Sequence, residues 1–110
     1  MTLNMIAQTP KPPYYAVIFS SIRTSGDDNA YAEMAELMIN LAQKQEGFLG
    51  VETARDSIGI TVSYWKDLQS IKQWKNHYQH QIAQRKGQNQ WYKSYKTRIA
   101  KVEQDYSFRK

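Results

Sequence analysis

The chain contains no cysteine among its 110 residues, so a disulfide framework and a thiolate metal site are both excluded. A cysteine-free sequence agrees with a reducing compartment, and we expect a cytoplasmic protein. The sequence also lacks any apolar run of about 18 residues, the minimum for a helix that crosses a bilayer. We therefore expect no membrane association.

Proline is scarce and falls entirely within residues 10–13. The N-terminal stretch MTLNMIAQTPKPPYY has neither the basic start nor the long apolar segment of a signal peptide. Clustered prolines favour an extended conformation. We predict an extended lead-in over residues 1–13 and, because the remainder has the length of one domain, a single domain over residues 14–110.

Phosphate-binding glycine motifs are missing as well. The chain has only 5 glycines, and neither G-x-G-x-x-G nor a P-loop occurs, so nothing supports a nucleotide cofactor. The net charge of +5 is uneven: residues 1–65 carry 4 Lys/Arg against 7 Asp/Glu, and residues 66–110 carry 11 against 3. A basic half can attract nucleic acid or an anionic ligand, although such a charge excess more often belongs to a solvated surface.

Alternating and helical hydrophobic patterns follow one another along the chain. YYAVIFSSI is rich in β-branched and aromatic residues, as strands are, whereas Tyr31, Met34, Met38 and Leu41 recur at helical spacing. Asp67 can cap a second helix. The patterns predict strands over 14–22, 48–56, 60–65 and 94–108, with helices between about 28 and 46 and between 68 and 86.

The order β-α-β-β-α-β predicts an α+β, ferredoxin-like fold with a four-stranded antiparallel sheet and both helices on one face. The first strand is nevertheless apolar on both sides, with Tyr15, Val17 and Phe19 on one and Tyr14, Ala16, Ile18 and Ile22 on the other. A sheet with one solvated face reads as half polar. We therefore expect a second copy of the chain to cover the face without helices, as a homodimer.

The segments GFLGVETARD, ITVSYW, IKQWKNH and WYKSYKTRIAKVE resemble the antibiotic biosynthesis monooxygenase family, over about residues 14–108. The resemblance implies a dimeric α/β barrel, in which two sheets pack face to face. It also implies oxidation of a small quinol- or anthrone-like aromatic substrate by dioxygen, without flavin or metal. A deprotonated electron-rich substrate reduces oxygen directly, so the protein supplies a dry pocket, a base and hydrogen-bond donors.

Candidate site residues follow from this interpretation. We predict His77 and Trp74 as catalytic residues, because they lie three positions apart on one side of a helix and an imidazole can act as acid or base. We predict Phe19, Ser20 and Trp65 as substrate-binding residues. Core packing of the aromatic residues and a surface position for His77 are the alternatives. Arg55 and Asp56 are expected to form an exposed ion pair without function.

A second branch of the family binds and degrades haem through an Asn on the first strand, a Trp on the second helix and a His ten residues later. Trp74 matches the Trp, but the later position holds Gln84, and Phe19 or Ser20 stands near the Asn position. Glutamine lacks the imidazole nitrogen that ligates haem iron. His77 and His80 alone make a poor metal site, so we expect no cofactor and no metal.

Two other classes of function remain open. A non-catalytic dimeric domain that binds a small ligand is supported by the lack of an obviously placed acidic base, since a shared fold does not confer a shared activity. An RNA-recognition module would have the same element order, but it needs a glycine- and aromatic-rich third strand, which SIGITVSYW lacks. We therefore expect no nucleic-acid partner.

Overall fold

The computed structural model describes residues 5–26, 28–84 and 91–110, without the side chains of residues 80–84. The elements follow the predicted β-α-β-β-α-β order. They are β1 (Tyr14–Arg23), α1 (Asp28–Gln43), β2 (Phe48–Arg55), β3 (Gly59–Trp65), α2 (Leu68–Gln84) and β4 (Tyr92–Val102). Neither described helix is both long and apolar enough to cross a membrane.

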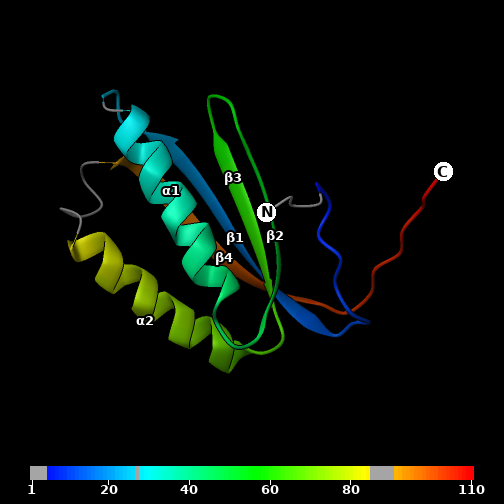
Figure 1. Cartoon of the computed structure of the whole chain (residues 1–110). Coiled ribbons are helices and arrows are strands. Elements are labelled where there is room, and N and C mark those ends of the chain that lie inside the picture. Colours follow the sequence, from blue (N-terminus) through cyan, green and yellow to red (C-terminus); the bar gives the residue numbers. More distant parts are fainter. Residues whose placement is uncertain (1–4, 27, 85–90) are drawn as a thin grey trace.

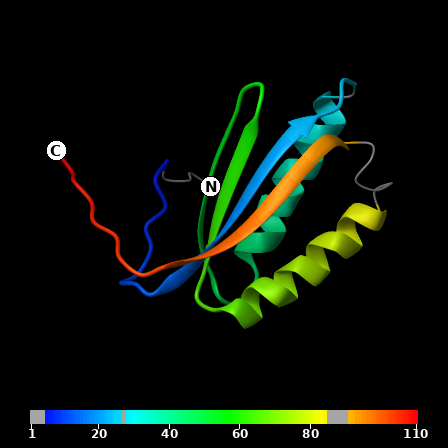
Figure 2. The same ribbon diagram turned by 180° about the vertical axis from the view of Figure 1, so that it is seen from behind.

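The four strands form one antiparallel sheet in the order β2-β3-β1-β4. Both helices lie on the same side of this sheet, so the opposite side has no helical layer (Figures 1 and 2). The short connection after β2 joins β2 and β3 in an antiparallel hairpin. The α+β, ferredoxin-like fold is therefore confirmed.

Side chains of β1 alternate between the two sides of the sheet. Tyr15, Val17 and Phe19 pack into the clusters beneath the helices. Their neighbours Ala16 and Ile18 therefore point to the other side, because successive strand residues face opposite ways. We call that second side the open face; it also carries Ile60, Val62 and Tyr64, which pair with β1 residues of the same face.

The core between sheet and helices consists of two adjacent clusters. One is built on Ala42, Trp65 and Ile71, and the other on Met34, Met38, Trp91 and Tyr92. Trp74 packs against both, so it joins them into one apolar layer. The predicted helical stripe at Met34 and Met38 therefore faces the sheet.

Local signals at the helix ends act largely as expected. The Asp67 carboxylate accepts a hydrogen bond from the Ser70 backbone N–H at 2.8 Å, which caps α2 and lowers the pKa of Asp67. Helix α1 ends at Gln43, and Gly47 lies four residues further on. Gly47 adopts a φ of 88°, and its carbonyl accepts the Lys66 backbone N–H at 2.8 Å, so it shapes the entry into β2.

The prediction for the last strand, residues 94–108, was wrong at its C-terminal end. Strand β4 begins two residues earlier and ends at Val102, which pairs with Tyr14. Pro12 and Pro13 precede Tyr14 and carry no backbone N–H, so β1 has no donor there to continue the ladder. The residues after Val102 form an extended tail instead (Figure 1).

The chain's own ends cover one end of the open face. The Tyr14 hydroxyl donates to Asp105 Oδ2 at 2.5 Å and accepts from Thr9 Oγ1 at 3.0 Å. The backbone N–H of Ala7 reaches Glu52 at 2.9 Å. The other end stays bare, where Ile22, Ile58 and Ile60 are 43, 49 and 42% exposed.

Replacing Gly47 with alanine should destabilise the fold more than replacing Gly26. Both glycines have positive φ, so both substitutions strain the backbone, but a methyl group at position 47 would also overlap the Ser70 hydroxyl, whereas position 26 is open. We expect Gly47→Ala to lower the free energy of unfolding by about 1–3 kcal/mol more than Gly26→Ala. Urea unfolding measures the difference; equal losses would contradict the packing of Gly47 against Ser70.

Candidate functional site

Four of the five candidate residues lie on the helical side of the sheet. Trp65, Trp74 and Phe19 pack in the two core clusters, and the His77 ring lies 5.8 Å from the Trp74 ring. Ser20 lies on the open face, because it follows Phe19 in β1. The fold thus brings Trp74, His77, Phe19 and Trp65 into one layer and separates Ser20 from them.

Trp65 and Trp74 form the centre of this layer. Their rings stack at 6.0 Å between centroids with an interplanar angle of 23°. Trp65 is 0% exposed, and its indole N–H already donates to Ser63 Oγ at 2.9 Å. Trp74 is only half-buried. A ligand could therefore touch the face or edge of Trp74, while Trp65 acts by fixing that ring in place.

His77 has an unusual environment for a helix residue near the surface. It follows Trp74 by almost one helical turn, so the two rings lie on neighbouring positions of the same side. Its Nε2 atom is buried and has no hydrogen-bond partner among the described residues. A buried ring nitrogen without a partner is costly unless something binds it. One hydrogen-bonding atom of His77 is therefore left unpaired beside the Trp74 ring.

A group of tyrosines around Phe19 was not predicted as part of a site. The Phe19 ring lies 5.3–6.5 Å from the rings of Tyr78, Tyr92 and Tyr95. The Tyr92 hydroxyl is 3.4 Å from that of Tyr31 on α1. Sequence patterns count Tyr31 and Tyr78 as apolar stripe positions, and nothing in them shows that the hydroxyls converge.

Burial keeps Tyr78 and Tyr92 protonated. Loss of hydration raises the pKa of Tyr78 and of Tyr92, and the other tyrosines nearby raise the pKa of Tyr92 further. The Tyr78 ring lies 5.9 Å from the Trp74 ring, so a neutral phenol that can donate a hydrogen bond lies beside Trp74. Such a donor can stabilise negative charge that develops on an oxygen atom.

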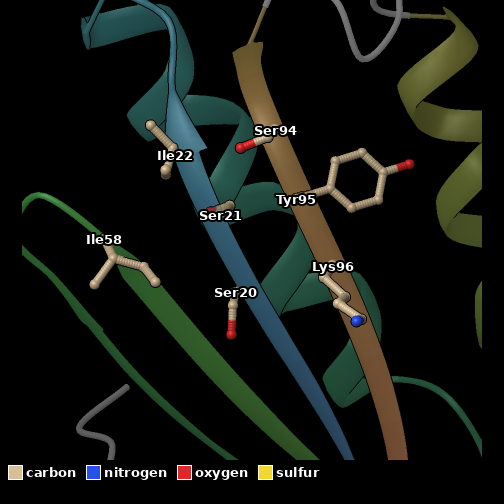
Figure 3. Close-up of a pocket in the computed structure, with 7 residues that line it drawn as sticks. All are labelled: Ser20, Ser21, Ile22, Ile58, Ser94, Tyr95 and Lys96. Carbon is tan, nitrogen blue, oxygen red and sulfur yellow. The ribbon is translucent and has the colours of Figure 1, made fainter.

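The hollow that the structure describes lies at the exposed end of the sheet. It has a volume of about 260 Å³, and its lining comes from β1, β4 and the β2–β3 turn (Figure 3). The lining residues are Ser20, Ser21, Ile22, Ile58, Ser94, Tyr95 and Lys96. This hollow includes Ser20 and Ile22 of the open face, and Trp74 and His77 do not line it.

The residues compared with the haem-degrading branch are only partly described. Trp74 occupies α2 as expected, but the side chains of Gln84 and His80 lie outside the described residues. Within the described part of the chain, no three His, Asp or Glu side chains come together in a group that could hold a metal ion. The prediction that haem and metal are not used stays a prediction.

Comparisons with known proteins bear on the family and on the fold. The chain is 50% identical over 108 residues to the "Uncharacterized protein YqjZ" of Bacillus subtilis, covering 96% of this chain and 94% of that protein. No protein-family model matches the chain.

Solved structures share the fold at low sequence identity. Protein PA3566 from Pseudomonas aeruginosa has a TM-score of 0.66 at 13% identity, covering 88% of this chain and 99% of its own. Two proteins described as "putative antibiotic biosynthesis monooxygenase" also match. The one from Nitrosomonas europaea has a TM-score of 0.64 at 14% identity and covers 86% of this chain and 94% of its own. The one from Chloroflexus aurantiacus has a TM-score of 0.63 at 16% identity and covers 86% of this chain and 97% of its own. The chain therefore has an antibiotic biosynthesis monooxygenase-like fold.

The buried tyrosines predict a loss of stability at alkaline pH. Their pKa values are raised in the folded state above the ordinary value of 10.0, so their contribution is complete below pH 10 and is lost as pH rises further. Above pH 10, Tyr92 should lower the free energy of unfolding of the wild type by about 1 kcal/mol per pH unit. Tyr92→Phe should lack this part of the decline. Urea unfolding at several alkaline pH values tests this.

Tyr106→Phe is the matched control, because Tyr106 is fully exposed and should leave the alkaline loss unchanged. Identical pH profiles for the wild type and Tyr92→Phe would contradict the burial of the Tyr92 hydroxyl.

Proposed function

This chain belongs to the family of the Bacillus subtilis protein YqjZ, and from that premise and the geometry of its helical side we propose that it is a cofactor-independent monooxygenase. The proposed substrate is a small quinol- or anthrone-like aromatic molecule, and the oxidant is dioxygen. The observation that carries the proposal is the buried, unpartnered Nε2 of His77 beside the half-buried ring of Trp74. The cysteine-free sequence supports a cytoplasmic location.

The proposed reaction needs no external reductant. For an anthrone-like CH₂ group, a base removes one proton, and the resulting carbanion passes electrons to dioxygen. One oxygen atom stays on the carbon as a carbonyl group. The other leaves as water with the two hydrogens of the CH₂ group, so one dioxygen is consumed for each substrate.

Each candidate residue has a distinct role in this proposal. His77 accepts the substrate proton, because its Nε2 has no competing partner among the described residues. Trp74 stacks on the substrate and is held by Trp65. The hydroxyl of Tyr78 donates to the oxyanion that develops as the proton leaves. Phe19 packs against the Tyr78 ring and fixes its position.

The proposal includes a homodimer formed through the open face. Ile22, Ile58 and Ile60 are between 42 and 49% exposed, and they lie at the end of that face that the chain's own termini leave bare. Apolar side chains on the second side of a sheet indicate another layer. A second copy packing its own open face there would bury Ser20 in the interface, so a role for Ser20 in substrate binding would require substrate to reach that interface.

A non-catalytic small-ligand-binding function is the second candidate, and one observation favours it. Enzymes that use histidine as a base commonly orient the ring with a carboxylate or another hydrogen-bonded group. The Nε2 atom of His77 has no such partner among the described residues. A binding protein would use the same aromatic layer without turnover.

Oxygen consumption with anthrone and a panel of quinols separates these functions. We expect uptake above buffer by the wild type and a loss of about 10²-fold or more in His77→Asn, since general-base catalysis contributes roughly that much. Gln79→Ala, an exposed change on the same helix, is the control and should keep wild-type uptake. Substrate binding without uptake by the wild type would favour the second candidate.

Charge on the open face should dissociate the dimer. Ile60→Glu places a carboxylate in the proposed interface, whereas Leu68→Glu places the same charge on an exposed position of α2. Size-exclusion chromatography with light scattering should show a monomer for Ile60→Glu and a dimer for Leu68→Glu and the wild type. A dimer that survives Ile60→Glu would place the contact elsewhere.

A further inference from the structure

Two arginines flank Tyr31 at the end of the sheet where β1 leads into α1. The Cζ atom of Arg23 lies 3.7 Å from the Tyr31 ring centroid, and that of Arg55 lies 5.7 Å away. Arg23 forms a salt bridge with the carboxylate of Asp28, whose Oδ1 is 2.7 Å from Arg23 Nη1. Because two positive charges share one described carboxylate, the cluster carries an excess positive charge.

Arg55 supplies that excess. The expected ion pair with Asp56 is wrong: within the described residues, no carboxylate lies at salt-bridge distance from Arg55. Its Nη2 donates to Ser21 Oγ and, at 3.4 Å, to the Tyr31 hydroxyl, and its Nη1 donates to the Ser21 carbonyl at 3.4 Å. These neutral acceptors orient the guanidinium and leave its charge uncompensated.

Gly59 allows this position of Arg55. The two residues pair across β2 and β3, and a methyl group at position 59 would overlap the Arg55 guanidinium. The cation thus lies against the backbone of the neighbouring strand, close to Tyr31. A charge held in place before binding loses less freedom when a ligand arrives.

Further donors beside Tyr31 also lack acceptors. Arg23 Nε and Trp91 Nε1 are buried, and neither has a hydrogen-bond partner among the described residues. Trp91 is 5% exposed, and its ring lies 6.0 Å from that of Tyr31. Buried donors without acceptors are rare in proteins because each loses its hydration. An anion with several acceptor atoms would satisfy such donors.

We propose that the residues around Tyr31 form a binding site for a small aromatic carboxylate. A planar guanidinium matches the two oxygens of a carboxylate, and the half-buried ring of Tyr31 offers apolar surface for an attached aromatic ring. Arg55 is the principal anchor, and Arg23 adds charge. The site shares no residue with Trp74 and His77, so it stands whether or not the chain is an oxygenase.

Calorimetric titration with benzoate tests the site, with benzamide as the neutral analogue of the same shape. We expect saturable benzoate binding and at least about tenfold weaker benzamide binding, because a charged hydrogen bond is lost. Arg55→Gln should weaken benzoate binding about tenfold or more. Gly59→Ala keeps every charge but displaces the guanidinium, so it should weaken binding comparably.

Lys72→Gln is the control, since it removes one positive charge from an exposed position on α2 and should leave benzoate binding unchanged. Urea unfolding of each variant establishes that it is folded. If Arg55→Gln does not fold, Gly59→Ala still tests the site. Equal binding of benzoate and benzamide, no measurable binding of benzoate, or equal weakening by Lys72→Gln and Arg55→Gln would each overturn the proposal. Wild-type binding by a folded Gly59→Ala would do so as well.

Discussion

The structure depends on one constraint: a sheet with two apolar sides has only one layer of helices. The helices bury Tyr15, Val17 and Phe19 of β1, and the termini cover the other side only near Tyr14. Isoleucines at the other end of the open face remain in contact with solvent in a single chain. Hydrophobic side chains so placed favour a further layer, and in the proposed dimer a second sheet provides it.

The same constraint decides where chemistry can occur. If the open face is an interface, the helical side is where a ligand meets residues of one chain, and there the aromatic rings form a continuous layer from His77 through Trp74 and Tyr78 to Tyr92 and Tyr31. Trp65 fixes Trp74, and burial keeps Tyr78 and Tyr92 neutral. The layer ends near two arginines, so an apolar surface and a cationic surface lie beside each other at Tyr31.

Much of this fold is readable from the sequence, because hydrophobic period and helix caps are local signals. The order of elements, the two-sided first strand and the Asp67 cap all follow from neighbouring residues. The end of β4 does not, because it depends on where β1 stops offering partners. Arg55 was mispredicted for a similar reason: its position is set by the missing side chain of Gly59 on another strand. The convergence of tyrosine hydroxyls likewise requires three elements to be placed together.

The central claim, that the open face is covered in solution, is tested most directly by nuclear magnetic resonance with a soluble paramagnetic probe. In a single chain, Ile60 and Leu68 are 42 and 54% exposed, and Ile71 is buried. The account predicts that the Ile60 methyl signals are protected from the probe to nearly the same degree as those of Ile71, while Leu68 is strongly relaxed. Relaxation of Ile60 as strong as that of Leu68 would show a bare sheet and contradict the account.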